Sequence, residues 1–200
     1  MTDAPSLTEP KVVTDGRRLR TADSRARIIA AMLDLARSGH ITFSAELVAE
    51  HAGVGLRTVF RHFKDMDSLY REMSLVIEAS LRDELLQPFK AADWRGQLSE
   101  LMRRRAAAFE KLTPFKRAEA AHRHRSQALE QDIQRMTRML RDRLKALLVG
   151  SPVTDPGYFE SLDLLLSFES WQRLRREQEL SFEQAQGVLG LAVDRLLAGL

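Results

Sequence analysis

The side chains best suited to chemistry lie close together in one short segment, and the chemistry that they suit is nucleic-acid recognition. Arg57, Thr58, Arg61 and His62 are near neighbours, and Lys64 follows them. Arginine can pair with guanine through two hydrogen bonds, whereas lysine, threonine and histidine suit phosphate oxygens. This mixture predicts a surface that contacts both the bases and the backbone of a DNA duplex.

The distribution of charge points to the same part of the chain. The protein has 200 residues and a net charge of +3. Residues 17–64 contain nine basic residues against four acidic ones, whereas residues 65–200 are balanced. A basic excess confined to one segment favours a polyanionic partner for that segment. On charge alone, a solvated surface that only aids solubility is the alternative.

A further group of basic residues precedes that surface. It lies before and within the first turn of a helix that we expect to begin near Asp23 or Ser24, either of which can cap it. The group consists of Arg17, Arg18, Arg20, Arg25 and Arg27. A flexible basic arm can enter a minor groove, so Arg27 is included among the predicted DNA contacts.

Two very short helices are expected to position the candidate DNA contacts. Ser44 can cap a helix that ends near His51, and Gly53 separates it from a second helix that ends near His62. Counted from Ala45, small and apolar residues occupy the packing positions of a helix-turn-helix: Ala49, Gly53, Val54 and Val59. The second helix of that motif enters the major groove. An ordinary pair of packed helices is the alternative.

The remainder of the chain is predicted to be helical as well, because apolar residues recur every three or four positions and no segment alternates as a strand would. The fold class is therefore all-α. We expect a disordered tail at 1–16, a DNA-binding domain at 17–65 with its helix-turn-helix at about 44–63, and a helical domain at 66–200. Asp65 is predicted to cap a helix that reaches about Leu85. The helices predicted after it are about 93–112, 114–124, 126–149, 158–178 and 182–199.

The composition and motifs exclude several classes of function. With 44% apolar residues the chain can form a core, and without cysteine it has no disulfide, thiolate metal site or cysteine nucleophile. There is no apolar run long enough to span a membrane and no secretory signal, so we expect a cytoplasmic protein. No phosphate loop, metal-ligand pair or nucleophile arrangement is recognisable, so no catalytic residue, cofactor or metal is expected.

Residues 48–65 read VAEHAGVGLRTVFRHFKD, which resembles the signature of the TetR family of bacterial transcriptional regulators, usually IAxxAGVSxGTLYxHFxxKExL. The specific resemblance covers about residues 25–85. Residues 168–175 also resemble the penultimate helix of many members. The resemblance implies a homodimer that binds double-stranded DNA, and we interpret the protein as a repressor that a small-molecule effector releases from its operator.

Carried over by position, the resemblance implies two kinds of DNA contact. Base edges would be faced by Leu56, Arg57 and Arg61. The backbone would be held by Ser44, Thr58, Phe60, His62 and Lys64. Three positions depart from the family pattern, because Gly55 replaces the serine that caps the helix, Arg57 replaces a glycine, and Phe60 replaces a tyrosine.

The resemblance also implies dimerisation through the last two long helices. A helix over 158–178 would be apolar on two sides, and such a helix must bury both. The predicted interface comprises Leu164, Phe168, Trp171, Val188, Leu189, Ala192 and Leu196. The alternative is a helix that lies wholly inside one chain.

An effector cavity is the second implication for the C-terminal domain. The apolar residues that could line it are Met73, Ile77, Trp94, Met102, Phe109, Met136 and Phe168. Methionine adapts to varied ligands, but plain core packing explains the same residues without a ligand. A domain that only dimerises or docks a protein partner, with no effector, is therefore an alternative.

Overall fold

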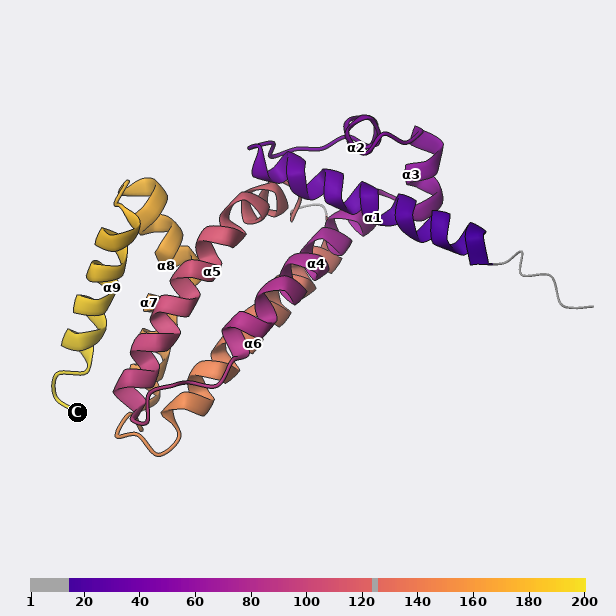
Figure 1. The fold of residues 1–200 in the computed structure, drawn as a ribbon. Helices are drawn as coiled ribbons and strands as arrows, with labels where there is room; N and C mark the ends of the chain where they lie inside the picture. The colour runs from indigo at the N-terminus through magenta and orange to yellow at the C-terminus, as the bar shows by residue number, and fades with distance from the viewer. Residues whose placement is uncertain (1–14, 124–125) are drawn as a thin grey trace, which may run out of the picture.

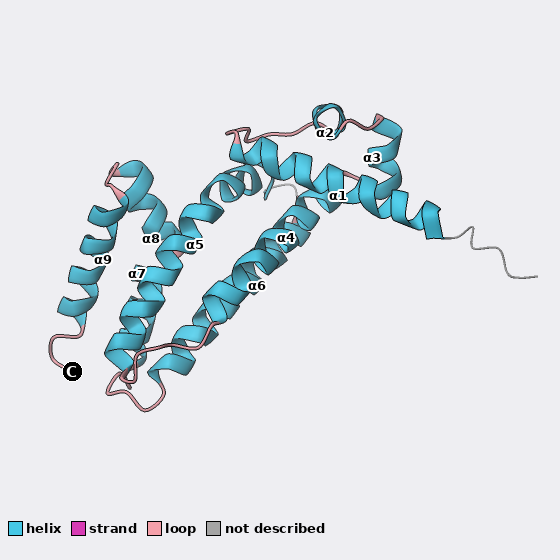
Figure 2. Cartoon of the chain, in the orientation of Figure 1, coloured by secondary structure: helices cyan, strands magenta, loops and turns pink. Residues whose placement is uncertain are grey.

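A computed structural model describes residues 15–123 and 126–200 of the protein. All regular elements in these two ranges are helical, which confirms the predicted all-α fold class (Figure 1, Figure 2). In chain order they are α1 (Asp15–Arg37), α2 (Ala45–Ala52), α3 (Leu56–His62), α4 (Met66–Leu86), α5 (Trp94–Arg123), α6 (Gln127–Leu148), α7 (Pro156–Leu165), α8 (Phe168–Gln172), the π-helix η1 (Arg173–Glu177) and α9 (Phe182–Leu196).

The first three helices lie together at one end of the longer ones (Figure 1). Helices α2 and α3 pack on α1, and α4 runs from the end of α3 alongside α5 and α6. Helices α7, α8 and α9 contact α5 and α6 or each other. The α2–α3 pair is thus joined directly to the rest of the molecule through α4.

The apolar core crosses the predicted domain boundary near residue 65. One buried cluster extends from Met32 of α1 through Met73 of α4 and Phe109 of α5 to Trp171 of α8. A second cluster, which includes Leu144 and Leu162, fills the far end of the C-terminal helices. Because α1–α3 share their core with α4 and α5, a movement of α4 can be transmitted to α3.

Short-range signals fix the ends of the N-terminal helices. Gly39 adopts φ +96° just after α1, and its N–H donates to the carbonyl of Ala36 at 3.0 Å. Asp65 caps α4, because its carboxylate accepts from the N–H of Ser68 at 2.8 Å while the Ser68 hydroxyl accepts from the Asp65 N–H at 3.3 Å. This reciprocal capping box starts α4 soon after α3 ends.

Helix α1 begins earlier than predicted. It starts at Asp15, not near Asp23, so Asp15 and Gly16 belong to the helix and not to the tail. Residues 17–23 contain good helix formers and no proline, which lets the helix extend toward the N-terminus. Most of the predicted tail, residues 1–14, lies outside the described residues.

The predicted restart of the helix at Pro114 is also wrong, because α5 continues through it. A proline inside a helix removes one hydrogen bond and opposes the turn before it. Here Thr113 is buried, its hydroxyl donates to the carbonyl of Phe109 at 2.8 Å, and the Gln172 amide donates to that hydroxyl at 2.6 Å. These contacts hold the turn helical despite the proline.

The single helix predicted at 158–178 is in fact three elements. Ser167 adopts an extended conformation (ψ 160°) after α7, and its hydroxyl accepts from the N–H of Ser170 to start α8. The interruption frees the carbonyl of Leu166, which accepts a hydrogen bond from the buried guanidinium of Arg105 at 3.0 Å. A contact from α5, far away in the sequence, therefore helps to stabilise the break.

Candidate nucleic-acid interface and effector cavity

The turn between α2 and α3 is built from local hydrogen bonds. Ser44 caps α2 as predicted, because its hydroxyl accepts from the N–H of Leu47 at 3.1 Å. Gly53 has φ +61°, which glycine adopts at little cost, and its N–H donates to the carbonyl of Glu50 at 3.0 Å. The N–H of Val54 donates to Ala49, also at 3.0 Å. The sharp turn fixes the direction in which α3 leaves α2.

Helix α3 has one buried side and one exposed side. Val59 is 1% exposed and faces α1 and α2, whereas Phe60 is 50% exposed on the outer side. Arg57 and Arg61 are exposed, and neither forms an ion pair with any carboxylate of the described residues. Leu56 is exposed as well. The outer side of α3 therefore presents two free guanidinium groups beside two apolar side chains.

The residues assigned to the DNA backbone surround this surface. Ser44 and Lys64 are exposed, and Thr58 and His62 are half-buried. The Nε2 atom of His62 is buried without a hydrogen-bond partner. Burial, followed by the charges of Arg61 and Arg25, lowers the pKa of His62 from its ordinary value. His62 is thus neutral in the free protein at neutral pH.

Arg27 does not extend toward DNA as predicted. Its guanidinium donates to the carbonyls of Ala52 at 2.6 Å and Gly53 at 3.0 Å. Those carbonyls would otherwise lack donors at the C-terminus of α2. The basic arm is also revised, because residues 15–20 are helical and Arg25 pairs with Glu72 at 2.6 Å. Arg27 therefore joins α1 to the end of α2, and Arg25 joins α1 to α4.

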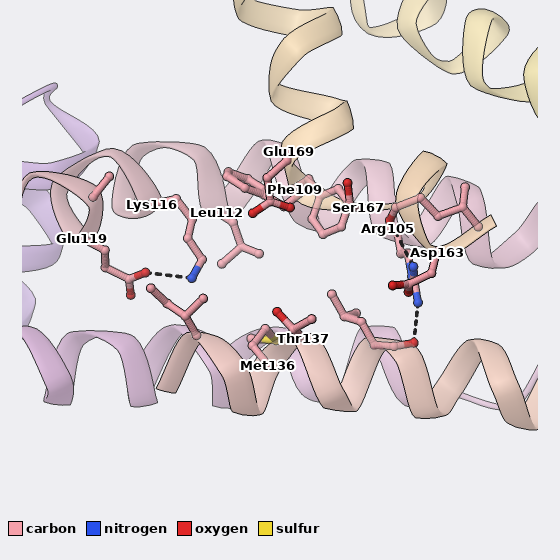
Figure 3. A pocket seen from close by; sticks show the side chains of 15 residues that line it. Arg105, Phe109, Leu112, Lys116, Glu119, Met136, Thr137, Asp163, Ser167 and Glu169 are labelled. Carbon is pink, nitrogen blue, oxygen red and sulfur yellow. Dashed lines mark hydrogen bonds and ion pairs between the residues drawn. The ribbon is translucent and has the colours of Figure 1, made fainter. Parts of the chain in front are cut away.

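A cavity of about 170 Å³ lies between α5, α6 and the junction of α7 with α8 (Figure 3). Phe109, Met136 and Phe168 line it, as predicted for an effector site. Phe109 and Phe168 meet edge to face, with their ring centroids 5.5 Å apart. Sequence reasoning missed the other lining residues, some of which are apolar, such as Leu112 and Ile133. The missed residues that are charged or polar include Arg105, Lys116, Glu119, Thr137 and Asp163.

Four predicted pocket residues lie elsewhere. Met73 is fully buried in the core, and Ile77 lies beside a separate hollow between α1, α4 and α5. Met102 faces a groove between α5 and α9, and half-buried Trp94 lies under the guanidinium of Arg95. Apolar periodicity identifies the inner faces of helices, but most of an inner face packs against another helix and not against a cavity.

Four of the seven predicted dimer residues are clearly either exposed or buried. Leu164 is 66% exposed on α7 and Val188 is 44% exposed on α9, where Leu191 is also exposed. Trp171 and Leu189 are instead buried in the core of the chain, so the prediction that they contact a partner is wrong. The break at Ser167 turns Trp171 inward, where its indole N–H donates to Glu110 at 2.8 Å and its ring meets Phe182.

The three remaining interface predictions are intermediate. Phe168 lines the cavity, and Ala192 and Leu196 are half-buried, with Leu196 packed against the second apolar cluster. The exposed apolar side chains on α7 and α9 are therefore Leu164, Val188 and Leu191. Exposed apolar groups of this kind on helices mark protein interaction sites when they lie together.

Comparison with solved structures shows which fold these helices form. A transcriptional regulator from Rhodococcus sp. Rha1 covers 88% of this chain and 97% of its own length, with 21% identity and a TM-score of 0.71. Another Rhodococcus structure, assigned to the TetR family of transcriptional regulators, covers 87% and 98%, with 21% identity and a TM-score of 0.68. The chain has the TetR fold.

The same fold relates the chain to a third structure, the multidrug binding protein EbrR complexed with imidazole. The match covers 94% of this chain and 97% of the EbrR chain, with 21% identity and a TM-score of 0.57. No protein-family model and no curated protein matches the sequence. The resemblance of residues 48–65 to the TetR signature is thus confirmed at the level of the fold.

Within this TetR fold, one departure from the family signature has a visible consequence. Gly55 is the N-cap of α3, and α3 consequently has no side-chain cap.

Across residues 15–123 and 126–200, no group of three acidic or histidine side chains is arranged to hold a metal ion. Among the helices in those ranges, none combines the length and apolarity needed to cross a membrane.

Proposed function

We propose that this protein is a dimeric DNA-binding transcriptional regulator, and that α3 is the helix that enters the major groove. The observation that carries the proposal is the outer side of α3, where Arg57 and Arg61 are exposed and unpaired while Val59 anchors the helix underneath. Guanidinium groups left free on a helix held by its opposite side are suited to base edges. The TetR fold supports the same assignment.

The proposed contacts divide into those that read sequence and those that position the protein. We assign base contacts to Leu56, Arg57 and Arg61, which lie on the exposed side of α3. We assign backbone contacts to Ser44, Thr58, Phe60, His62 and Lys64 around it. Arg27 is withdrawn from the second group, because its guanidinium is bound to the C-terminus of α2.

One α3 is too short to specify an operator by itself, so the proposal includes a homodimer. A two-fold dimer would place two recognition helices in successive major grooves, roughly 34–36 Å apart. The exposed apolar side chains of α7 and α9, Leu164, Val188 and Leu191, are the proposed interface. Burying them against a second copy would remove apolar surface that a monomer leaves in water.

We further propose that the protein represses transcription and that an effector in the cavity releases it from DNA. The cavity wall includes Glu119 of α5, which accepts a hydrogen bond from Ser74 of α4. Helix α4 begins directly after α3, so an effector that moves this contact can move the recognition helix. Shifting the population from 1:99 to 99:1 requires about 5.5 kcal/mol of differential binding.

DNA binding is tested by selection from randomised duplexes, followed by titration of the enriched sequence. A palindromic site with two half-sites one helical turn apart is expected, and its absence would overturn the proposal. Arg57→Ala should cost about 1–3 kcal/mol at one base position. Lys64→Ala should weaken all sequences equally and reduce the salt slope by about one. Arg138→Ala, which removes an exposed arginine from α6, is the control and should change neither.

The proposed interface is tested by sedimentation. Leu164→Asp and Leu191→Asp should each convert the dimer to monomer at micromolar concentration, because a buried unpaired carboxylate is strongly unfavourable. Val149→Asp is the matched control, because Val149 is 81% exposed but lies in the loop after α6. A dimer that survives both helix substitutions would place the interface elsewhere.

A further inference from the structure

The cavity between α5, α6 and α7–α8 contains an unusual distribution of charge, which bears on the kind of molecule that it could bind. Phe109 and Met136 lie along its middle, where Thr137 and Glu169 also lie, and Phe168 is a further lining residue (Figure 3). Arg105 and Asp163 lie at one end, and Lys116 and Glu119 at the other (Figure 3). Given the proposed role of this cavity as an effector site, these charged groups select the class of molecule that it accepts.

Arg105 is the cavity residue whose charge is least compensated. It is only 2% exposed, and its terminal nitrogens donate to the main-chain carbonyls of Leu166 and Leu140, which carry no net charge. Its Nε–H is buried and has no acceptor. It forms no ion pair with a carboxylate among the described residues, and burial lowers its pKa to about 10, although Asp163 partly opposes this effect.

The other buried charges of the cavity have partners. Lys116 pairs with Glu119 at 2.8 Å, and both side chains are mostly buried. Asp163 pairs with Arg141 of α6 at 2.6 Å. Glu169 has no such partner, but it is exposed to water, which screens its charge. The charge that is both buried and unpaired in this cavity is therefore the positive charge of Arg105.

The size of the cavity restricts the ligand further. Its volume of about 170 Å³ is close to the roughly 150 Å³ of an apolar cavity that holds one benzene ring. It is smaller than the roughly 300–1,000 Å³ of sites for drug-sized ligands. The edge-to-face pair of Phe109 and Phe168 provides aromatic surface on which one ring can pack.

We propose that the effector is a compact monocarboxylic acid with a single apolar ring, and that its carboxylate binds the guanidinium of Arg105. The Nε–H supplies a free donor, and the anion neutralises a cation that the protein itself leaves unpaired. The ring packs beside Phe109 and Phe168. A charged hydrogen bond formed inside the protein is stronger than the same bond at the surface.

Three probes of nearly equal shape test this assignment by calorimetry on the full-length protein: benzoate, benzamide and benzamidine. Benzoate should bind at least tenfold more tightly than benzamide, and benzamidine should bind most weakly. A preference for benzamidine, equal affinities, or no binding by any of the three would overturn the proposal. This comparison uses the unaltered chain, so it does not depend on any variant being folded.

Variants then locate the carboxylate. Arg105→Met should abolish the preference for benzoate, whereas Arg105→Lys should retain the preference with lower affinity. Thermal unfolding of each variant shows whether it is folded. Glu169→Gln should tighten benzoate binding up to several-fold, because it removes a like charge from the residues that line the cavity. Arg138→Met, outside the cavity, should leave benzoate affinity unchanged. A benzoate preference that survives Arg105→Met in a folded protein would overturn the role of Arg105.

A DNA titration separates this inference from the proposed function. If benzoate binds with the expected preference but leaves the affinity for the selected duplex unchanged, the proposed ligand class is supported. The proposal that an effector releases the protein from DNA is then wrong. If the protein binds its duplex but does not prefer benzoate to benzamide and benzamidine, the DNA-binding proposal is supported and the proposed ligand class is wrong. If benzoate lowers DNA affinity in the unaltered protein but not in Arg105→Met, both are supported.

Discussion

The N-terminal helices and the C-terminal helices of this molecule are stabilised by polar contacts of different range. In α1–α3 and at the start of α4 the polar side chains that cap helices are close neighbours in sequence, as Ser44 is to Leu47 and Asp65 is to Ser68. Helices of the C-terminal part are capped by close neighbours as well, as Ser181 is to Gln184, but other polar side chains there pair across distant segments. Trp171 donates to Glu110 across 61 residues, and Arg135 donates to Glu78 across 57. Arg27, which binds the end of α2 across 25 residues, lies between these extremes.

This difference agrees with the roles proposed above for the two parts. A short recognition helix needs its orientation fixed by its own turn, because helices of seven or eight residues are marginal by themselves. A ligand-binding part needs helices that are held at a distance from one another, which long-range contacts provide. The apolar core nevertheless runs through both, from Met32 to Trp171. The two parts should therefore differ in local stability but unfold together.

The largest expected effect concerns that shared core. Trp171→Ala removes a side chain that is 1% exposed and packed on Phe182. It should lower the free energy of unfolding by about 3–5 kcal/mol. Urea titration followed by circular dichroism measures the loss, and Trp94→Ala, at a half-buried position, is the control with a smaller loss. The melting of the variant should still be one transition, and two separate transitions would contradict a continuous core.

The range of contacts also explains which features could be predicted from the sequence. Ser44, Gly53 and Asp65 act on backbone groups within a few residues, so their local patterns sufficed to predict the caps and the turn. The exposure of Arg57 and Arg61 followed from the same local geometry. The structure departs from prediction at Pro114 and at Ser167, where Gln172 and Arg105 supply hydrogen bonds from distant segments. Local periodicity contains no information about those partners.

The candidate cavity shows the same limit. Phe109, Met136 and Phe168 were identified because apolar residues are the usual lining of a pocket. Arg103, Arg104 and Arg105 follow one another in the sequence, and only the packing of α5 against α6 and α8 makes Arg105 the buried one. The inward turn of Trp171 likewise depends on the break at Ser167, which a helical wheel drawn over 158–178 does not contain.

The second prediction compares a glycine in each part of the molecule. Gly53 and Gly150 both have a positive φ, of +61° and +78°, so alanine at either position costs about 1 kcal/mol through the backbone. At Gly53 a Cβ would also lie 2.9 Å from Nη2 of Arg27, whereas at Gly150 it meets nothing within 4 Å. Gly53→Ala should therefore be the more destabilising variant, by up to about 1 kcal/mol, the typical net value of a hydrogen bond.

Both glycine variants are measured by urea titration, and DNA affinity is measured alongside. Gly53→Ala should also weaken DNA binding, because displacement of Arg27 loosens the end of α2 from which α3 departs. Gly150→Ala should leave DNA affinity unchanged. Equal losses of stability would mean that Arg27 contributes nothing to the orientation of the recognition helix.

A third, smaller effect is the pH dependence that His62 gives to the N-terminal part. Burial, then Arg61 and Arg25, lowers its pKa in the folded protein, so the unfolded chain binds a proton at a higher pH than the folded one does. Its contribution to stability is complete above about pH 6.5, the ordinary histidine value, and is lost as the pH falls below it. His62→Gln should flatten the stability curve between about pH 7 and pH 5. An unchanged slope would show that His62 is protonated as easily in the folded protein as in the unfolded one.

The smallest effect is expected at the uncapped start of α3. Gly55 is extended (φ −72°, ψ 147°) there, and a Cβ would meet nothing within 4 Å. Gly55→Ser supplies a hydroxyl for the free N–H groups of α3 and should stabilise the protein by a few tenths of a kcal/mol, whereas Gly55→Ala supplies none. The serine variant should therefore exceed the alanine variant by about 1 kcal/mol in urea titrations. If alanine stabilises as much as serine, the gain comes from restricting the unfolded chain, and α3 is held by Val59 and the turn at Gly53 without any need for a cap.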